Sequence, residues 1–206
     1  MAAAPPGNIP TRRTGWPVLR TPRWMLAGAV VLVVGLTLVA IPHHPSTAER
    51  ASDLRGVVHD MNTDIESCAG GVSESLTAMQ QIQSGASHDL KTAIGIATLG
   101  AANCSPANSM PMDDLVQYQV PESLASFHLD TTVNDLVTWG FPDAQRVQAD
   151  VVAVLTATTP PAIRAAIAQL HHDQGVLNAE RATIDGMINA ASRSLSADVA
   201  PPPLPS

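Results

Sequence analysis

Ten positions spaced alternately four and three residues apart run without a fault through the C-terminal part of the chain. They are Ile163, Ile167, Leu170, Gln174, Leu177, Arg181, Ile184, Ile188, Ala191 and Leu195. This spacing places all ten on one face of an α-helix, because a helix completes a turn every 3.6 residues. Eight of the ten are apolar, so the face must be buried against other elements of the same chain. Thr159, followed by two prolines, is the expected start of this helix.

A second apolar stripe with spacings of three and four covers residues 54–82. Ser46 followed three residues later by Glu49 predicts the start of a helix through a capping box, and residues 84–85 predict its end. The pair Gly70-Gly71 lies inside this helix, where each glycine costs about 1 kcal/mol relative to alanine. We therefore expect either a close approach of another backbone or a kink at that point.

Two further helices complete the predicted domain. One begins at Ser87, ends near Cys104 and turns Leu90, Ile94, Ala97 and Ala101 inward. After a polar connection over residues 105–120, the other opens at Pro121, breaks at residues 140–142 and then resumes. The chain shows no strictly alternating, turn-bounded strand pattern. The sequence therefore predicts a mainly α, antiparallel, four-helix-bundle-like domain.

The two cysteines test this arrangement. Cys68 precedes the predicted turn at Ser84 by sixteen residues, and Cys104 follows Ser87 by seventeen. These segments are about 24 Å and about 25.5 Å long as helices, so a helical hairpin brings the two sulfurs to the same height. We expect a disulfide between Cys68 and Cys104. A buried free thiol at Cys68 is the alternative, whereas a catalytic thiol lacks a basic environment in the local sequence.

An almost wholly apolar run, residues 24–41, precedes the predicted bundle. A helix of eighteen residues is about 27 Å long, close to the thickness of a bilayer core, so we expect a single transmembrane helix. Residues 1–23 contain four arginines, five prolines and no acidic residue, and are expected to form a disordered basic cytoplasmic tail. The domain over residues 42–198 then lies outside the membrane, and the proline-rich residues 199–206 are expected to be disordered.

Two alternatives for the N-terminal region stay open. A cleaved signal peptide fits the basic start, although the apolar run is long and no small-x-small cleavage site precedes Pro42. A twin-arginine export signal is suggested by Arg12 and Arg13, although the apolar run begins only eleven residues later. All eighteen acidic residues and seven of the eleven basic residues follow the apolar run. This acidic balance argues against a nucleic-acid partner.

Candidate chemistry in the sequence is sparse. Seven histidines suggest a metal site, but no His-x-x-x-His or Glu-x-x-His spacing occurs, and the neighbours His171-His172 point about 100° apart on a helix. A site assembled from His59, His88, His128 and His171 across helices is the alternative. The segment from His59 to Glu66 resembles the start of a calcium loop but lacks its glycine and its closing glutamate. No nucleotide-binding motif is present. We therefore expect no metal and no cofactor, and no residue is assigned a catalytic role.

Four residues are candidates for a pocket or partner surface. Gln174 and Arg181 are the polar members of the apolar stripe, and a guanidinium in an apolar seam must find a carboxylate. Arg181 is expected to extend outward or to pair with an acid of a neighbouring helix, and otherwise marks a polar pocket. Trp139 and Phe141, with Tyr118, form either a plug over the predicted helix break or an exposed recognition patch.

The stretch WGFPDAQRVQAD, residues 139–150, is followed by an alanine-rich helix. It resembles a pattern found in actinobacterial membrane-anchored or lipoprotein-like helical proteins of the cell envelope, and covers about a third of the chain with that helix. The chain departs from the lipoprotein version because no cysteine follows the apolar run. The resemblance implies a helical fold in the cell envelope and supplies no catalytic residue.

These observations lead to two main functional hypotheses, besides a structural or sensor element whose basic cytoplasmic tail contacts a partner protein. The first is a single-pass, membrane-anchored module that binds a ligand or an envelope protein outside the membrane without catalysis. The alternative is a metal-dependent or hydrolytic enzyme whose site forms only between helices. Convergence of titratable groups in a concave pocket would favour the enzyme.

Overall fold

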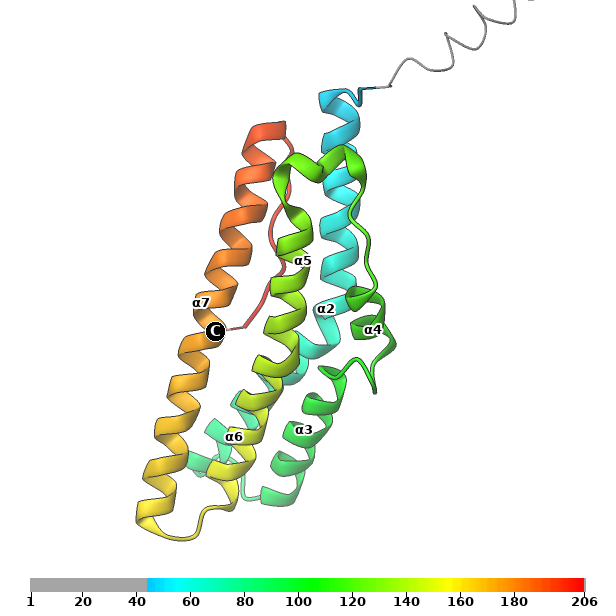
Figure 1. Ribbon diagram of the computed structural model, residues 1–206. Helices are drawn as coiled ribbons and strands as arrows, with labels where there is room; N and C mark the ends of the chain where they lie inside the picture. The colour runs from blue at the N-terminus through cyan, green and yellow to red at the C-terminus, as the bar shows by residue number, and fades with distance from the viewer. Residues whose placement is uncertain (1–43, 206) are drawn as a thin grey trace, which may run out of the picture. The chain divides into compact units, whose positions relative to one another are not determined.

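The structure is a computed structural model that describes residues 44–205. The predicted basic tail, residues 1–23, and the predicted transmembrane helix, residues 24–41, lie outside the described residues. Residues 44–205 contain no strand, and none of their helices is long and apolar enough to cross a membrane. The predicted mainly α fold is confirmed, as is its bundle-like packing (Figure 1). The elements are α2 (Thr47–Gln83), α3 (Leu90–Asn103), α4 (Met110–Val116), η1 (Glu122–Phe127), α5 (Leu129–Thr138), η2 (Trp139–Ala144), α6 (Gln145–Thr156) and α7 (Pro160–Leu195).

Helix α2 begins and ends where its sequence predicts. The Ser46 hydroxyl accepts a hydrogen bond from the backbone N–H of Glu49, and the Glu49 carboxylate accepts one from the backbone N–H of Ser46. Ser84 caps the C-terminus, and Gly85 follows in the left-handed region at φ +74°. The predicted stripe of α2 is buried except for Ile82, which is half-buried, and the helix contacts α3, α4, α6 and α7. It therefore forms one wall of the core along its full length.

Helix α3 differs from the prediction at its N-terminus and on its inner face. Its cap is Asp89, which accepts from the N–H of Thr92, and not Ser87. Ala93, Ala97 and Gly100 are buried, whereas Leu90, predicted to face inward, is 41% exposed. Small residues face α2 because the two backbones lie very close together. A β-carbon built on Gly71 would lie 2.7 Å from the Cα atom of Gly100. The predicted close backbone approach is therefore confirmed at Gly71.

The predicted break at residues 140–142 is confirmed, but the predicted start at Pro121 is wrong. Residues 122–127 form the 3-10 helix η1, and α5 begins only at Leu129, because the backbone turns at His128 with a left-handed φ of 52°. α5 and α6 follow one another through η2, where Phe141 has non-helical φ and ψ of −140° and 114° and Pro142 lacks an N–H donor. Both α5 and α6 pack against α7, which begins at Thr159 as predicted and buries Leu170, Leu177, Ile184 and Ile188. The connection before η1 contains one element that the sequence analysis does not predict, the seven-residue helix α4.

Residues 199–205 differ from the disordered tail that their prolines suggest. After α7 the chain turns at Ser196, which has a left-handed φ of 49°, and runs back along the bundle (Figure 1). Leu204 is only 5% exposed, so the tail packs against the helices instead of leaving them. Burial of this one large apolar side chain offers a physical reason why the tail is ordered.

Candidate functional site

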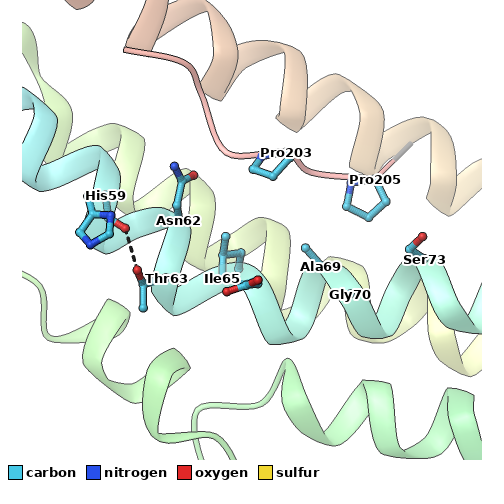
Figure 2. Close-up of a pocket in the computed structure, with 10 residues that line it drawn as sticks. His59, Asn62, Thr63, Ile65, Ala69, Gly70, Ser73, Pro203 and Pro205 are labelled. Carbon is cyan, nitrogen blue, oxygen red and sulfur yellow. Dashed lines mark hydrogen bonds between the residues drawn. The ribbon is translucent and has the colours of Figure 1, made fainter. Parts of the chain in front are cut away.

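A groove with a volume of about 590 Å³ lies between α2 and the C-terminal tail (Figure 2). One wall is formed by side chains about one helical turn apart on α2, and the other by two prolines of the tail. The lining residues are His59, Asn62, Thr63, Ile65, Glu66, Ala69, Gly70 and Ser73 from α2, with Pro203 and Pro205 from the tail. A volume of this size is typical of small-molecule and peptide pockets.

The tail wall is positioned by contacts with α7. The Ser192 hydroxyl donates to the carbonyl oxygen of Ala197 and the backbone N–H of Ala197 donates to the carbonyl oxygen of Ser192, which closes the turn after α7. Further along, Nη1 of Arg181 donates to the carbonyl oxygen of Leu204 at 3.1 Å. The Leu204 side chain is buried, and the flanking Pro203 and Pro205 line the groove. Arg181 therefore supports the groove from behind its tail wall.

The groove combines apolar surface with hydrogen-bonding groups. Ile65, Ala69 and the two prolines supply apolar contacts. Oδ1 of Asn62 is buried and has no hydrogen-bond partner, whereas the Thr63 hydroxyl already donates to the carbonyl oxygen of His59 at 3.0 Å. A buried acceptor without a donor costs free energy. A ligand with an N–H or O–H group at this position would satisfy it.

The helices that carry the groove are fixed by covalent and close backbone contacts. Cys68 and Cys104 form the predicted disulfide, with their Cα atoms 4.6 Å apart, and join α2 to the end of α3. Both cysteines are fully buried. The amide of Gln148 lies beside this junction and donates to Sγ of Cys104 at 3.7 Å. The middle of α2, from which Ala69 and Gly70 line the groove, is thus held at a rigid helix crossing.

The four predicted surface residues do not come together. Arg181 is half-buried and bonds a backbone carbonyl, which is neither the outward extension nor the acid partner expected for it. Gln174 is half-buried on α7, outside the groove lining. Trp139 is fully buried at the helix break, whereas Phe141 is 40% exposed. The two aromatic residues therefore separate into a plug and a surface side chain, and neither lines the groove.

Several titratable groups with shifted pKa values lie outside the groove lining. Burial, hydrogen bonding to Asp173 and the charge of Asp173 raise the pKa of Asp150 on α6 to about 6. Burial also raises the pKa of Glu180 on α7. None of these three residues lines the groove. Within residues 44–205, no three His, Cys, Asp or Glu side chains are close enough to hold a metal ion, so His59, His88, His128 and His171 do not converge.

The sequence alone assigns no pocket to the residues that line the groove, although residues 59–66, which include five of them, resemble an incomplete calcium loop. Asn62, Thr63 and Ser73 lie on the polar side of the α2 stripe, where a sequence pattern shows only a solvated face. Pro203 and Pro205 belong to a segment whose composition indicates disorder. The available signal was Leu204, the one large apolar residue in an otherwise small and proline-rich tail.

Comparison of this chain with protein-family models, with curated proteins and with solved structures finds no match. Its function therefore has to be inferred from its own residues.

Proposed function

We propose that this chain is a single-pass, membrane-anchored binding module of the cell envelope, and that it acts outside the membrane without catalysis. The groove between α2 and the tail carries this proposal. Its volume is about 590 Å³, its lining is both apolar and polar, and Asp150, the carboxyl group whose pKa is raised to about 6, is not part of it. Perturbed titratable groups gather where catalysis needs them. Their separation from the groove favours binding over catalysis.

The sequence supports the location. The apolar run over residues 24–41 and the arginine-rich residues before it favour an anchor with its N-terminus in the cytoplasm. The disulfide between Cys68 and Cys104 fits an oxidising compartment outside that membrane. The resemblance of residues 139–150 to actinobacterial envelope proteins points to the same compartment. The bundle is thus proposed as the first extracytoplasmic part of the chain, a four-helix-bundle-like domain close to the membrane.

The alternative, an enzyme with a site between helices, needs catalytic groups around a cavity. The groove presents two titratable side chains, His59 and Glu66, and both lie on the exposed surface of α2. Asp150 on α6 and Asp173 on α7 influence each other's pKa, and neither residue lines the groove. We therefore place the enzyme second.

Two exposed glycines of α2 allow a matched test of the binding function. A β-carbon at either Gly70 or Gly56 meets no atom within 4 Å, but only Gly70 lines the groove. Gly70→Leu fills the groove with an isobutyl group, whereas Gly56→Leu adds the same group elsewhere on the same helix. Both changes also replace glycine with a better helix former.

The measurement is native mass spectrometry of the full-length protein released gently from its own membranes. We expect extra mass bound to the wild-type chain and to Gly56→Leu, and a loss of at least tenfold in its occupancy for Gly70→Leu. Bound mass that is equal in the two variants would place the binding site outside the groove. A bare chain in all three samples would contradict the binding function itself.

A further inference from the structure

The C-terminal tail lies against the bundle in the way a bound peptide would. We call its binding site the seat; it consists of the apolar hole filled by Leu204 and the side chain of Arg181, which donates to the Leu204 carbonyl oxygen. Residues 199–205 have no helical or strand structure and follow the helices back from the end of α7 (Figure 1). Leu204 inserts into the core at 5% exposure, and Pro202 is also buried. Pro203 is exposed and Pro205 half-buried, at the edge of the groove (Figure 2).

The contacts that hold this segment are those of extended peptide recognition. Proline restricts the preceding residue to extended conformations, so Leu204 presents its carbonyl oxygen at low entropic cost. Arg181 donates to that oxygen, and the Leu204 side chain fills an apolar hole. Residues 199–205 carry no charged side chain, and four of the seven are prolines that have no N–H group to leave unpaired.

The segment is also weakly tied to the bundle. Beyond the turn at Ala197, the hydrogen bond from Arg181 is the one bond that the structure gives between residues 199–205 and the helices. The tail is therefore held by one hydrogen bond and by the burial of Leu204 and Pro202. A competing peptide that repeats both features can replace it.

We propose that the seat beside α2 and α7 binds an extended, uncharged, proline-containing peptide of a partner protein, and that residues 199–205 are an internal strap that competes for it. The proposal rests on the proposed binding function and names its ligand class. The open groove provides room beside the seat for the peptide to pass α2, where Oδ1 of Asn62 lacks a donor. The partner residue in the apolar hole is leucine or a similar aliphatic residue directly before proline.

The test uses a fluorescein-labelled peptide with the sequence VAPPPLPS, identical to residues 199–206, and fluorescence anisotropy. The strap is loosened in the full-length variant Leu204→Ala and removed in a variant that ends at Asp198. We expect both variants to bind the peptide at least tenfold more tightly than the wild-type chain. A peptide with alanine in place of leucine is the matched control and is expected to bind at least tenfold more weakly. Arg181→Met in the Leu204→Ala background is expected to weaken binding as well.

Circular dichroism and the intact disulfide mass establish that each variant is folded before binding is compared. Equal affinity of the folded variants and the wild-type chain, or no binding to any of them, would overturn the proposal. A dimer of the wild-type chain, formed by exchange of tails that keep Leu204, would also overturn it, because the occupant would then be a second copy of this chain. If these results occur while Gly70→Leu still removes a bound ligand, the binding function stands and the peptide class is wrong.

Discussion

Two adjacent glycines of α2 face opposite environments, and their substitution is expected to have opposite effects. A β-carbon at Gly71 would lie 2.7 Å from the Cα atom of Gly100, a backbone atom that cannot move without separating α2 from α3. Gly71→Ala is expected to lower the free energy of unfolding by about 1–3 kcal/mol, as in overpacked cores. Gly70→Ala meets open space and is expected to raise it by about 0.5–1 kcal/mol.

Urea unfolding followed by circular dichroism at 222 nm measures both changes against the wild-type chain. Because the two residues are neighbours in one helix, helix propensity cancels in the comparison, and the remaining difference reports the contact with Gly100. A shift of the same sign and size in both variants would contradict the close crossing of α2 and α3.

At the scale of single residues, the sequence predicts a contact only where the residue type itself restricts what can lie next to it, as a glycine inside a helix does. The glycine pair indicated a close approach, and the structure shows that one of the two makes it. The sequence predicts a carboxylate partner for Arg181, but its acceptor is the carbonyl oxygen of Leu204. No local pattern could identify that atom, because it is brought to α7 by the turn at Ser196.

Between elements, the disulfide is the strongest single link. It joins α2 to the end of α3 across a sequence separation of 36 residues. On the chain-entropy model, closure of such a loop stabilises the fold by roughly 3–4 kcal/mol. The double variant Cys68→Ala/Cys104→Ala is expected to lose about that much free energy of unfolding in urea titrations. A loss below about 1 kcal/mol would show that the glycine crossing alone holds the hairpin.

A pair of carboxyl groups couples α6 to α7 and makes their contact dependent on pH. The pKa of Asp150 is raised from 3.8 to about 6, first by burial and then by Asp173, although Arg146 acts in the opposite direction. The pKa of Asp173 is lowered, chiefly by a hydrogen bond from the amide of Gln169, and His172 and Arg146 contribute to this. Asp150 therefore favours the folded state when protonated, and Asp173 when ionised.

The sign of the pH dependence follows from Asp150. A carboxyl whose pKa is higher in the folded state stabilises it below pH 3.8, and this contribution is lost as the pH rises through about 6. Asp150→Asn keeps a hydrogen-bond donor for Asp173 and removes the charge. The variant is expected to be more stable than the wild-type chain by about 0.5 kcal/mol at pH 7.5, the scale of an exposed charge pair, and to lose this advantage at pH 4. Urea midpoints at the two pH values measure it, and an advantage larger at pH 4 would contradict the assignment.

Whole elements were predicted well where periodicity and caps agree. The apolar stripes, the capping box at Ser46 and the start at Thr159 located α2 and α7. The helix α4 was missed because seven residues with two buried side chains are too short for a periodic signal. At the start of α3, Ser87 and Asp89 are both residue types that cap helices. Asp89 caps the helix by accepting from the N–H of Thr92, whereas the Ser87 hydroxyl accepts from the N–H of Asp89.

For the whole molecule, the tail shows the limit of composition as a guide. A segment with four prolines in seven residues is expected to be extended, because proline fixes its own φ and restricts the residue before it. The structure shows no helix or strand in this segment. Whether it is disordered depends on a hole for Leu204 and a donor from Arg181, both supplied by distant parts of the fold. The groove depends on the same packing, because Pro203 and Pro205 form one of its walls. The candidate site could therefore not be predicted without the tertiary structure.

The charge distribution along the chain leads to a prediction about its membrane topology. Four arginines and no acidic residue precede the apolar run 24–41, whereas all eighteen acidic residues follow it. Basic residues next to a span remain in the cytoplasm, so a C-terminal reporter active only outside the membrane is expected to be active on the full-length chain. Replacement of all four arginines by glutamate is expected to reduce that activity severalfold, whereas replacement of Arg164 and Arg193 by glutamate, far from the run, is expected to leave it unchanged.

Intact mass in the membrane fraction distinguishes a retained anchor from a cleaved signal peptide, which would release a chain that has lost the run. A reporter active only in the cytoplasm would contradict the proposed orientation and, with it, the proposed envelope function.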